Sequence, residues 1–395
     1  MNVTITPKPL AGTVTPPPSK SIAHRALIAA ALAEGESRLS NLAQSRDIQA
    51  TRDCLAALKH GRPAGADGLP RLDCGESGST LRFLIPVALA LRGGGHFTGR
   101  GRLLERPLGP YFTLFDEKGI SYEKTGDGLT VRGRLTPGRY ALPGDVSSQF
   151  VTGLLYALPL LEGDSEIVLT TPLESRGYVD LTLDALEKFG VAVEEGPQGF
   201  RAPGNQTFRA RDLTIEADWS QAAFWYAASF LDGDIEIQGL NHDSVQGDRR
   251  IALDYWTLAR PGEVELDVSQ CPDLAPPLAA ISAGRCGVTH LTHAARLRDK
   301  ESDRLSAVAE VLTALGAEVL EGPDSLTLTG RDSLPGGAVV DSRNDHRIAM
   351  MAAVAALACE APVTITGAEC VAKSYPSFWE DYEKLGGDIR REGTV

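Results

Sequence analysis

The segment DKESDRL, residues 299–305, places three acidic and two basic side chains within seven residues. On an exposed helix such a segment is a solvated face whose ion pairs contribute little. Alternatively, Lys300, Glu301 and Arg304 contact a charged ligand, the cations binding its anionic groups and the carboxylate transferring protons. The choice between the two depends on what the other charged segments of the chain do.

Four further segments place cations or hydroxyl groups at the start of a predicted helix. A helix start favours an anion, because its backbone N–H groups and its dipole are positive there, so a cation at this position needs a reason. The ordinary alternative is a capping side chain, such as Ser19 or Asp345, beside solvated cations. Four such starts favour a polyanionic ligand. The segments are PPPSKSIAHRALIAAALAEGES (16–37), CGESGSTLRFLIP (74–86), GDVSSQFVTGLLYALPLL (144–161) and SRNDHRIAMMAAVAAL (342–357).

Other kinds of site find little support. His290 and His293 are close in sequence but lack a matching carboxylate or third ligand, so we expect no metal. The chain has no GxGxxG, GxxxxGK[ST] or GxSxG segment, and we expect no cofactor. The net charge of −13 disfavours nucleic acid and membrane surfaces as partners, yet a local cluster of cations can still bind a small anion.

Length and composition limit the architecture. A chain of 395 residues with 43% hydrophobic residues predicts a globular protein of two domains. The first residues have no apolar stretch of signal-peptide length, and the run from Ile348 to Cys359 is too short to span a bilayer. The six cysteines form no CxxC pair, which predicts reduced, buried thiols and a cytoplasmic location.

The elements that must position these residues repeat along the chain. A helix end, a glycine and a short alternating strand recur, most clearly in FDEKGISYEKTGDGLTVRG (115–133), LEKFGVAVEEGPQGFRAPG (186–204), LTALGAEVLEGPDSLTLTG (312–330) and YEKLGGDIRREG (382–393). The chance recurrence of such junctions in an α/β protein is the alternative explanation. The repeat predicts six related units, and its glycines are Gly61, Gly119, Gly190, Gly262, Gly316 and Gly386.

Seven ordered motifs resemble the enolpyruvylshikimate-phosphate synthase (3-phosphoshikimate 1-carboxyvinyltransferase) family. They are PSKSIAHRA, GESGSTLRF, ERPLG, VSSQFVTGLL, DKESDRL, NDHRIAM and AKSYPSF, and they extend over nearly the whole chain. The resemblance implies an α/β enolpyruvyl transferase fold of two domains, each built from three β-α-β-α-β-β units. Residues 1–17 and 217–395 would form a discontinuous domain, and residues 18–216 an inserted one. The resemblance also implies an active site in the cleft between the domains, faced by helix N-termini.

The resemblance further implies the reaction. Shikimate 3-phosphate would attack phosphoenolpyruvate through its 5-hydroxyl, and phosphate would leave from a tetrahedral intermediate. We therefore expect a monomer with two small-molecule substrates, acting in the shikimate pathway of aromatic amino-acid biosynthesis. The residues that resemble the phosphoenolpyruvate contacts are Lys20, Gly78, Arg82, Arg106, Gln149, Arg304, Arg347 and Lys373. Those that resemble the shikimate 3-phosphate contacts are Lys20, Ser21, Arg25, Ser147, Ser148, Gln149, Ser175, Asp273 and Lys300.

Two carboxylates resemble the family's catalytic groups. Glu301 would act as acid and base at the methylene carbon, and Asp273 as base for the hydroxyl, with Lys20 sharing in proton transfer. From the residues alone, Asp273 in QCPDLAPP is better explained as a loop cap before two prolines.

The sequence departs from the family's pattern at three places. Glu76 stands where many members have Asn, Phe83 where many have Pro, and SRGY (175–178) where Ser-Lys-Pro-Tyr is more usual. A carboxylate at position 76 would either repel phosphoenolpyruvate or pair with a neighbouring arginine.

Two alternative functions are compatible with the same fold. A UDP-N-acetylglucosamine enolpyruvyl transferase typically has a Cys in the loop that corresponds to GRGRLLERPLGP (99–110), and this loop has none. A non-catalytic binding module is disfavoured because both carboxylates and the cations are retained.

Overall fold

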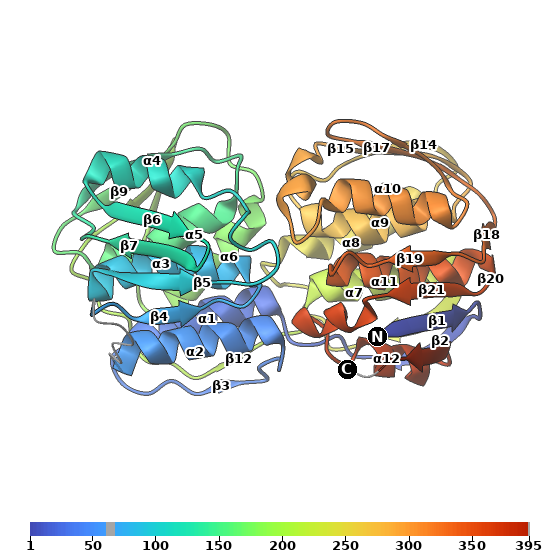
Figure 1. Ribbon diagram of the computed structural model, residues 1–395, viewed down its shortest axis with the longest axis horizontal. Helices are drawn as coiled ribbons and strands as arrows, with labels where there is room; N and C mark the ends of the chain where they lie inside the picture. Colours follow the sequence, from blue (N-terminus) through green and yellow to red (C-terminus); the bar gives the residue numbers. More distant parts are fainter. Residues whose placement is uncertain (61–67, 394–395) are drawn as a thin grey trace. The chain divides into compact units, whose positions relative to one another are not determined.

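The chain passes twice between two units. The computed structural model describes residues 1–60 and 68–393. One unit, here called the terminal unit, comprises Met1–Ser19 and Glu216–Val395, and the other, the inserted unit, comprises Lys20–Ile215. The blue N-terminal strand in Figure 1 lies among the red C-terminal elements, because both ends of the chain belong to the terminal unit.

Two complete repeats build most of the inserted unit. In each, the first two strands are parallel neighbours, and the last two form an antiparallel hairpin whose final strand pairs with the second. The first repeat consists of β4 (Arg71–Asp73), α3 (Gly78–Arg92), β5 (Gly94–Thr98), α4 (Gly109–Lys118), β6 (Ser121–Thr125) and β7 (Gly128–Arg132). The second consists of β8 (Gly138–Leu142), α5 (Ser148–Ala157), β9 (Ser165–Leu169), α6 (Arg176–Lys188), β10 (Glu194–Gly196) and β11 (Gly199–Ala202).

The terminal unit contains the same repeat twice. One copy consists of β14 (Gly262–Asp267), α9 (Ala275–Ala283), β15 (Gly287–Thr292), α10 (Arg304–Ala314), β16 (Glu318–Glu321) and β17 (Leu326–Gly330). The other consists of β19 (Val339–Asp341), α11 (His346–Ala355), β21 (Val363–Thr366), α12 (Phe378–Lys384), β22 (Asp388–Glu392) and, as its last strand, β1 (Asn2–Thr6). Strand β1 pairs with both β21 and β22, so the first residues of the chain complete a sheet begun by the last ones.

Each unit also has a less regular part assembled from distant segments. In the inserted unit, β12 (Leu213–Thr214) pairs in parallel with β3 (Leu39–Ser40), next to α1 (Lys20–Leu32) and α2 (Arg46–His60). In the terminal unit, β13 (Gly233–Ile237) pairs in parallel with β2 (Leu10–Val14), together with α7 (Trp219–Asp232) and α8 (Ile251–Leu258). A further short pair joins β18 (Leu334–Gly336) to β20 (Cys359–Ala361).

Glycines end the helices that precede the hairpins, as the sequence predicts. Gly119, Gly190, Gly316 and Gly386 have φ values of +64°, +77°, +97° and +94°, a conformation that costs an L side chain energy. Gly262 also has a positive φ but opens strand β14, and Gly61 lies outside the described residues.

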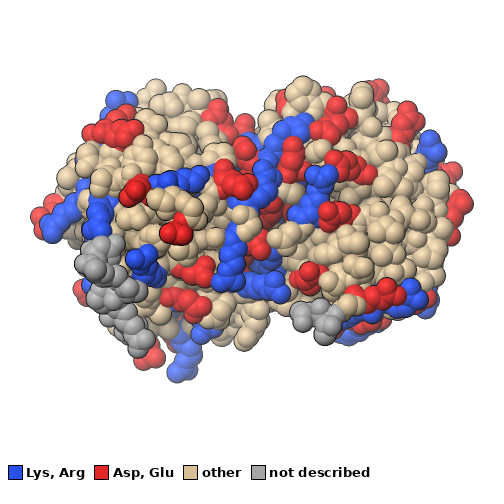
Figure 2. Space-filling model, in the orientation of Figure 1, with Lys and Arg blue, Asp and Glu red and all other residues tan. Residues whose placement is uncertain are grey.

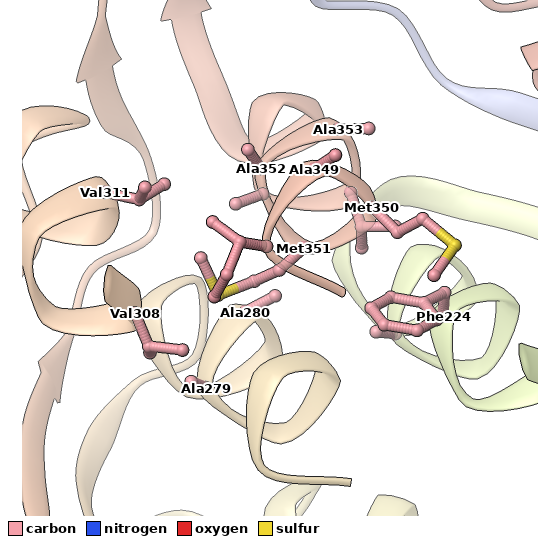
Figure 3. Packing of buried hydrophobic residues seen from close by; sticks show 14 of the residues in the cluster. Phe224, Ala279, Ala280, Val308, Val311, Ala349, Met350, Met351, Ala352 and Ala353 are labelled. Atoms are coloured by element: carbon pink, nitrogen blue, oxygen red, sulfur yellow. The ribbon is translucent and has the colours of Figure 1, made fainter. Parts of the chain in front are cut away.

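The core of the terminal unit forms around α11, which is buried along its whole length. Figure 3 shows Met350 and Met351 of α11 pointing toward Phe224 of α7 and toward α9, whose facing residues include Ala279 and Ala280. Small alanines let the helix backbones approach closely, and the flexible methionines fill the remaining space. Among the described residues no helix combines the length and the apolar character that crossing a membrane requires.

Five of the six cysteines are buried free thiols, as predicted. The prediction is wrong for Cys286, which is exposed and donates a hydrogen bond from its Sγ to Asp332 Oδ1 at 2.9 Å. It occupies the turn just before β15, where the chain reaches the surface.

Acidic and basic side chains are interspersed on the visible face of each unit (Figure 2). Many form exposed ion pairs, such as Arg201 with Asp164 and Glu194 in the inserted unit, and Arg391 with Glu380 in the terminal unit. Exposed pairs of this kind add little to stability.

Candidate active site

The segment DKESDRL is not a solvated helix face. The segment precedes and opens α10, with Asp303 capping the helix by accepting a hydrogen bond from Ser306 N at 3.1 Å. Arg304, the first residue of α10, is 1% exposed, although it is one of the largest polar side chains. A buried guanidinium requires partners, because burial of an unpaired charge is costly.

Three carboxylates surround the Arg304 guanidinium. Its nitrogen atoms lie 3.0 Å from Asp345 Oδ2, 2.6 Å from Glu301 Oε2 and 3.0 Å from Asp273 Oδ1. Burial alone would lower the pKa of Arg304, but Asp345, Glu301 and Asp273 raise it above its usual value. Arg304 therefore holds the two predicted catalytic carboxylates, Asp273 and Glu301, on one cation.

Asp273 lies in a short turn, η3 (Pro272–Leu274), and its carboxylate also contacts Arg347 Nη2 at 2.9 Å. Burial would raise the pKa of Asp273, but Arg347, Lys300 and Arg304 hold it well below its usual value of 3.8. The residues that precede η3 and α9, Cys271 and Leu274, make no side-chain cap. Asp273 belongs to an ionic cluster with Arg304 and Arg347, which a simple loop cap does not require.

Arg347 stands in the first turn of α11, where Asp345 caps the helix by accepting a hydrogen bond from Arg347 N at 2.9 Å. Its side chain donates to Ser220 Oγ at 2.6 Å and to the Asp273 carbonyl at 3.1 Å. Asp345 thus has two functions, since it caps α11 and also accepts from Arg304 and from Ser302 Oγ. Sequence reasoning identified only the cap.

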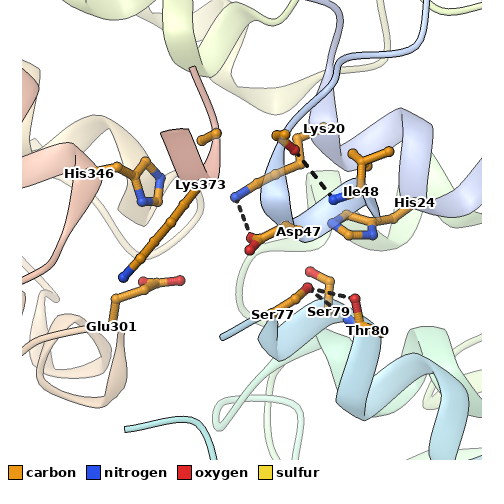
Figure 4. Close-up of polar contacts among 12 residues, drawn as sticks. Lys20, His24, Asp47, Ile48, Ser77, Ser79, Thr80, Glu301, His346 and Lys373 are labelled. Carbon is orange, nitrogen blue, oxygen red and sulfur yellow. Dashed lines mark hydrogen bonds and ion pairs between the residues drawn. The ribbon is translucent and has the colours of Figure 1, made fainter. Parts of the chain in front are cut away.

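Two lysines add positive charge to the same unit. Lys373 ends η6 (Ala368–Lys373), is 2% exposed, and donates from Nζ to the Asn344 carbonyl at 2.5 Å. Burial lowers the pKa of Lys300 to about 8, with Asp273 opposing the shift. Figure 4 shows the Lys373 and Glu301 side chains together with His346, the first residue of α11.

In the inserted unit, α1 opens with Lys20, whose Nζ lies 3.0 Å from Asp47 Oδ2 in the first turn of α2 (Figure 4). Nothing in the sequence pattern singled out Asp47 as this partner. His24, one turn further, bonds through Nδ1 to Thr51 Oγ1 at 2.7 Å, and Thr51 bonds to Thr80 of α3 at 2.6 Å. Burial, with Lys20 and Arg25 nearby, lowers the pKa of His24 well below its usual value, so the ring is neutral.

Arg25, in the second turn of α1, is 3% exposed and makes three hydrogen bonds within the unit. It donates to Thr182 Oγ1 at 2.9 Å and to the carbonyls of Ser21 and Tyr178, both at 2.7 Å. Its guanidinium lies 5.2 Å from the ring centre of Phe83, and burial lowers its pKa to about 10. Two of these bonds, to Thr182 and Tyr178, thus tie α1 to α6, and the third stays within α1 at Ser21.

The start of α3 collects the next group of predicted residues. Ser77 caps the helix by accepting from Thr80 N at 3.1 Å (Figure 4). Arg82 donates to Gln149 Oε1 at 2.8 Å and to the Pro107 carbonyl at 3.0 Å, and Gln149 donates to Ser79 Oγ at 3.1 Å. The structure therefore brings together α3, α5 and the loop before α4.

Gly78, the first residue of α3, lies directly against two guanidinium groups. A Cβ added to Gly78 would stand 2.6 Å from Arg106 Nη1 and 3.0 Å from Arg82 Nη1. The missing side chain lets both cations reach the helix start, where the N–H groups also favour an anion.

The remaining predicted hydroxyl groups stand at the starts of α5 and α6. Ser147 caps α5 and accepts from Gln149 N at 3.3 Å, while Ser148 is buried as its first residue. Ser175 precedes α6 with a left-handed backbone, φ +54°, and is 1% exposed. Nine of the ten predicted site residues of the inserted unit lie just before a helix or in its first two turns, and the tenth, Arg106, lies in the loop before α4.

The departures from the family pattern have local consequences. Phe83 is buried beneath Arg25 and edge-on to His24. Glu76 lies against Gly101, where an added Cβ would be 2.8 Å from Glu76 Oε2. Arg176, in the position of the usual lysine, makes a bidentate ion pair with Glu195 at 2.6 and 2.8 Å.

Among the described residues, no group of three His, Cys, Asp or Glu side chains is arranged to hold a metal ion. His290 Nε2 instead lies 2.7 Å from Glu263 Oε1, and His293 Nδ1 lies 3.6 Å from Asp267 Oδ2.

Comparison with known proteins supports the family resemblance that the sequence motifs indicate. Residues 5–382 match the family model for EPSP synthase (3-phosphoshikimate 1-carboxyvinyltransferase). The chain is 48% identical to the 3-phosphoshikimate 1-carboxyvinyltransferase of Clostridium kluyveri and 45% identical to that of Clostridium acetobutylicum, with 98% of each chain covered in both comparisons.

Solved structures confirm the predicted fold. EPSP synthase from Acinetobacter baumannii superimposes with a TM-score of 0.79 at 22% identity, covering all of both chains. The enolpyruvyl transferase NikO from Streptomyces tendae gives a TM-score of 0.76 at 20% identity over 98% of each chain. With the β-α-β-α-β-β repeat, the helix starts lined by cations and the family match over nearly its whole length, this chain belongs to the EPSP synthase (3-phosphoshikimate 1-carboxyvinyltransferase) family.

Proposed function

We propose that this protein transfers the enolpyruvyl group of phosphoenolpyruvate to the 5-hydroxyl of shikimate 3-phosphate and releases phosphate. The observation that carries the proposal is the pairing of Asp273 and Glu301 with the same buried guanidinium, that of Arg304. Two carboxylates fixed on one cation supply the proton acceptors and donors that an addition followed by an elimination needs.

The charges suit the substrates. Each substrate has a carboxylate and a phosphate, and a phosphate carries about −1.5 to −2 charges at neutral pH. We assign phosphoenolpyruvate to Lys20, Gly78, Arg82, Arg106, Gln149, Arg304, Arg347 and Lys373. We assign shikimate 3-phosphate to Lys20, Ser21, Arg25, Ser147, Ser148, Gln149, Ser175, Asp273 and Lys300. Both sets draw on both units, so the proposal includes a shared site in the cleft between them.

The proton transfers follow from these assignments. Addition delivers a proton to the methylene carbon of phosphoenolpyruvate, for which we propose Glu301, and removes one from the attacking hydroxyl, for which we propose Asp273. Elimination reverses both transfers, and Lys20 shares in them. Asp273 paired with two arginines is a weak base. Anionic substrates that compete for Arg347, Arg304 and Lys300 would raise its pKa toward the value that proton abstraction requires.

Phosphate release tests the proposal. We expect release from phosphoenolpyruvate only when shikimate 3-phosphate is also present, without added metal or nucleotide and with a chelator present. UDP-N-acetylglucosamine in place of shikimate 3-phosphate is the control for the sister activity. Phosphate release with UDP-N-acetylglucosamine but not with shikimate 3-phosphate would overturn the assignment. If neither acceptor led to phosphate release, the protein would be a non-catalytic binding module. That the enzyme acts as a monomer stays a prediction, which sedimentation of the same sample checks.

A further inference from the structure

Asp248 is a buried carboxyl group that the proposed mechanism does not use. It lies in the short turn η2 (Gly247–Arg250) of the terminal unit and is 6% exposed. Gln246, which directly precedes this turn, is held in place by two hydrogen bonds. Its side chain accepts from Trp219 N at 3.1 Å and donates to the Ala217 carbonyl at 2.9 Å. The turn therefore holds the Asp248 carboxyl at a set position beside the start of α7.

Ser220 connects Asp248 to the candidate base. The segment that carries Asp248 is bonded to Ala217 and Trp219 beside Ser220. The Ser220 hydroxyl, as a hydrogen-bond donor, favours the ionised form of Asp248 and lowers its pKa. Ser220 Oγ accepts from Arg347 Nη2 at 2.6 Å, so its own O–H is the group that donates to Asp248. The same Arg347 nitrogen contacts Asp273 Oδ2 at 2.9 Å. A continuous path thus runs from Asp248 through Ser220 and Arg347 to Asp273.

We propose that Asp248 is a positioning residue for Asp273 and Arg347, acting through Ser220, and that its neutral form is the active one. This inference rests on the proposed function. When Asp248 is neutral, Arg347 is shared between Asp273 and an incoming anion. When Asp248 is ionised, it attracts Arg347 through Ser220 and repels the anion.

The surroundings of Asp248 fix the pH range of this change. Burial first, then the charge of Asp273, raises the pKa of Asp248 to about 7, with Arg347 opposing the shift and Asp218 adding to it. The Ser220 hydrogen bond also opposes it. The other titratable groups nearby are Cys271, which bonds to Asp248, and Arg250 and Asp254 around that thiol. The carboxyl group therefore ionises as the pH rises through neutrality.

The test is the ratio of kcat/KM for phosphoenolpyruvate between Asp248→Asn and the wild type, measured from pH 6 to pH 8.5. Both proteins meet the same substrates, so the titration of the substrates cancels in the ratio. We expect the ratio to rise in favour of the variant by roughly 10-fold over this range, as one added charge near the anion would cause. Asp254→Asn, which removes a carboxyl paired with Arg250 in the same segment, should give a constant ratio.

Ser220→Ala is a second, independent variant. It removes the hydrogen bond that favours ionised Asp248, so the midpoint of the pH dependence should move to higher pH. A constant ratio for Asp248→Asn together with an unmoved midpoint for Ser220→Ala would overturn the proposal, because a merely structural role changes activity equally at every pH. If Asp248→Asn does not fold, the midpoint for Ser220→Ala decides alone.

A second experiment distinguishes failure of the proposed function from failure of the inference about Asp248. If the wild type released no phosphate with both substrates, the same variants would be tested by calorimetry with sulfate, a dianion that does not titrate between pH 6 and 8.5. Because Lys300 also loses its charge over this range in both proteins, the slopes are compared: sulfate affinity that falls more steeply with pH in the wild type than in Asp248→Asn would support the role of Asp248. Equal slopes in the two proteins would overturn it.

Discussion

Gly78 and Arg106 are in such close contact that the smallest side chain on the glycine would collide with the guanidinium, since an added Cβ would lie 2.6 Å from Arg106 Nη1. The obstructing atom is the end of a flexible side chain, so the fold can yield by moving Arg106. The movement would also disturb Arg82, whose Nη1 would lie 3.0 Å from the new Cβ.

Gly78→Ala should therefore fold normally and bind phosphoenolpyruvate less well. We expect KM for phosphoenolpyruvate to rise by roughly 10- to 100-fold, the equivalent of one hydrogen bond to a charged group. KM for shikimate 3-phosphate should change little. Steady-state kinetics in both substrates measure this, with Gly109→Ala as control, because a Cβ at Gly109 meets nothing within 4 Å. Unchanged kinetics would show that Arg106 does not bind phosphoenolpyruvate.

Asp273→Asn separates chemistry from binding. The amide keeps the shape of the side chain but removes the base, so kcat should fall by roughly 100-fold or more if general-base catalysis is its role. Calorimetry should show shikimate 3-phosphate binding largely retained. The control is Asp332→Asn, at an exposed carboxylate that accepts a hydrogen bond from Cys286. Normal turnover, or activity lost only through failed binding, would remove Asp273 from the mechanism.

Acid stability follows from the same carboxylate. The folded pKa of Asp273 lies below its unfolded value, so its contribution to stability is present above about pH 4 and is lost as the pH falls further. Urea unfolding at pH 7, 5, 4 and 3.5 should therefore show a steeper loss below pH 5 for the wild type than for Asp273→Asn. Parallel curves for the two proteins would mean that Arg304 and Arg347 do not stabilise the ionised form.

Lys300 should take up a proton when an anion binds. Its pKa of about 8 in the free protein leaves it mostly neutral at pH 9, and a bound anion favours the charged form. Calorimetry of shikimate 3-phosphate binding at pH 9, in two buffers of different ionisation enthalpy, should show uptake of up to about one proton. At pH 6.5 Lys300 is already charged, so its contribution should vanish. Lys300→Met should abolish the uptake at pH 9; equal uptake in that variant would assign the proton to another group.

The sequence predicts which charged residues stand at helix starts better than it predicts which residues they bond to. Cations at the start of a helix are unusual in electrostatic terms, so Lys20, Arg82 and Arg347 stand out without any coordinates. Asp47 reaches Lys20 and Asp345 reaches Arg304 from other elements, and no spacing along the chain connects such pairs. Arg25 was expected to contact a ligand, yet its donors also join α1 to α6, a use that only tertiary packing reveals.

The repeat was visible through its glycines because a helix followed by a hairpin needs a left-handed residue at one fixed place. The fourth strand of the last repeat was not visible, since β1 stands at the opposite end of the chain and has no glycine to mark it. The less regular parts around β3 and β2 pair segments that are 174 and 223 residues apart, and periodicity along the chain cannot reveal such pairing.

Arg106 and Arg347 test whether residues of both units serve one substrate. Arg106 lies beside the start of α3 in the inserted unit, and Arg347 lies in the first turn of α11 in the terminal unit. A guanidinium holds an anion in the ground state as well as in the transition state, so its loss should act mainly on binding.

We expect Arg106→Ala and Arg347→Ala each to raise KM for phosphoenolpyruvate by roughly 10- to 100-fold, with a smaller effect on kcat for Arg106→Ala. Arg347→Ala should also lower kcat, because Asp273 loses one of its two guanidinium partners. The exposed Arg139 and Arg331, one in each unit, provide matched Ala controls that should leave both constants unchanged. If only one of the two site variants affected phosphoenolpyruvate, the substrate would be bound by a single unit, and the proposed shared site would be wrong.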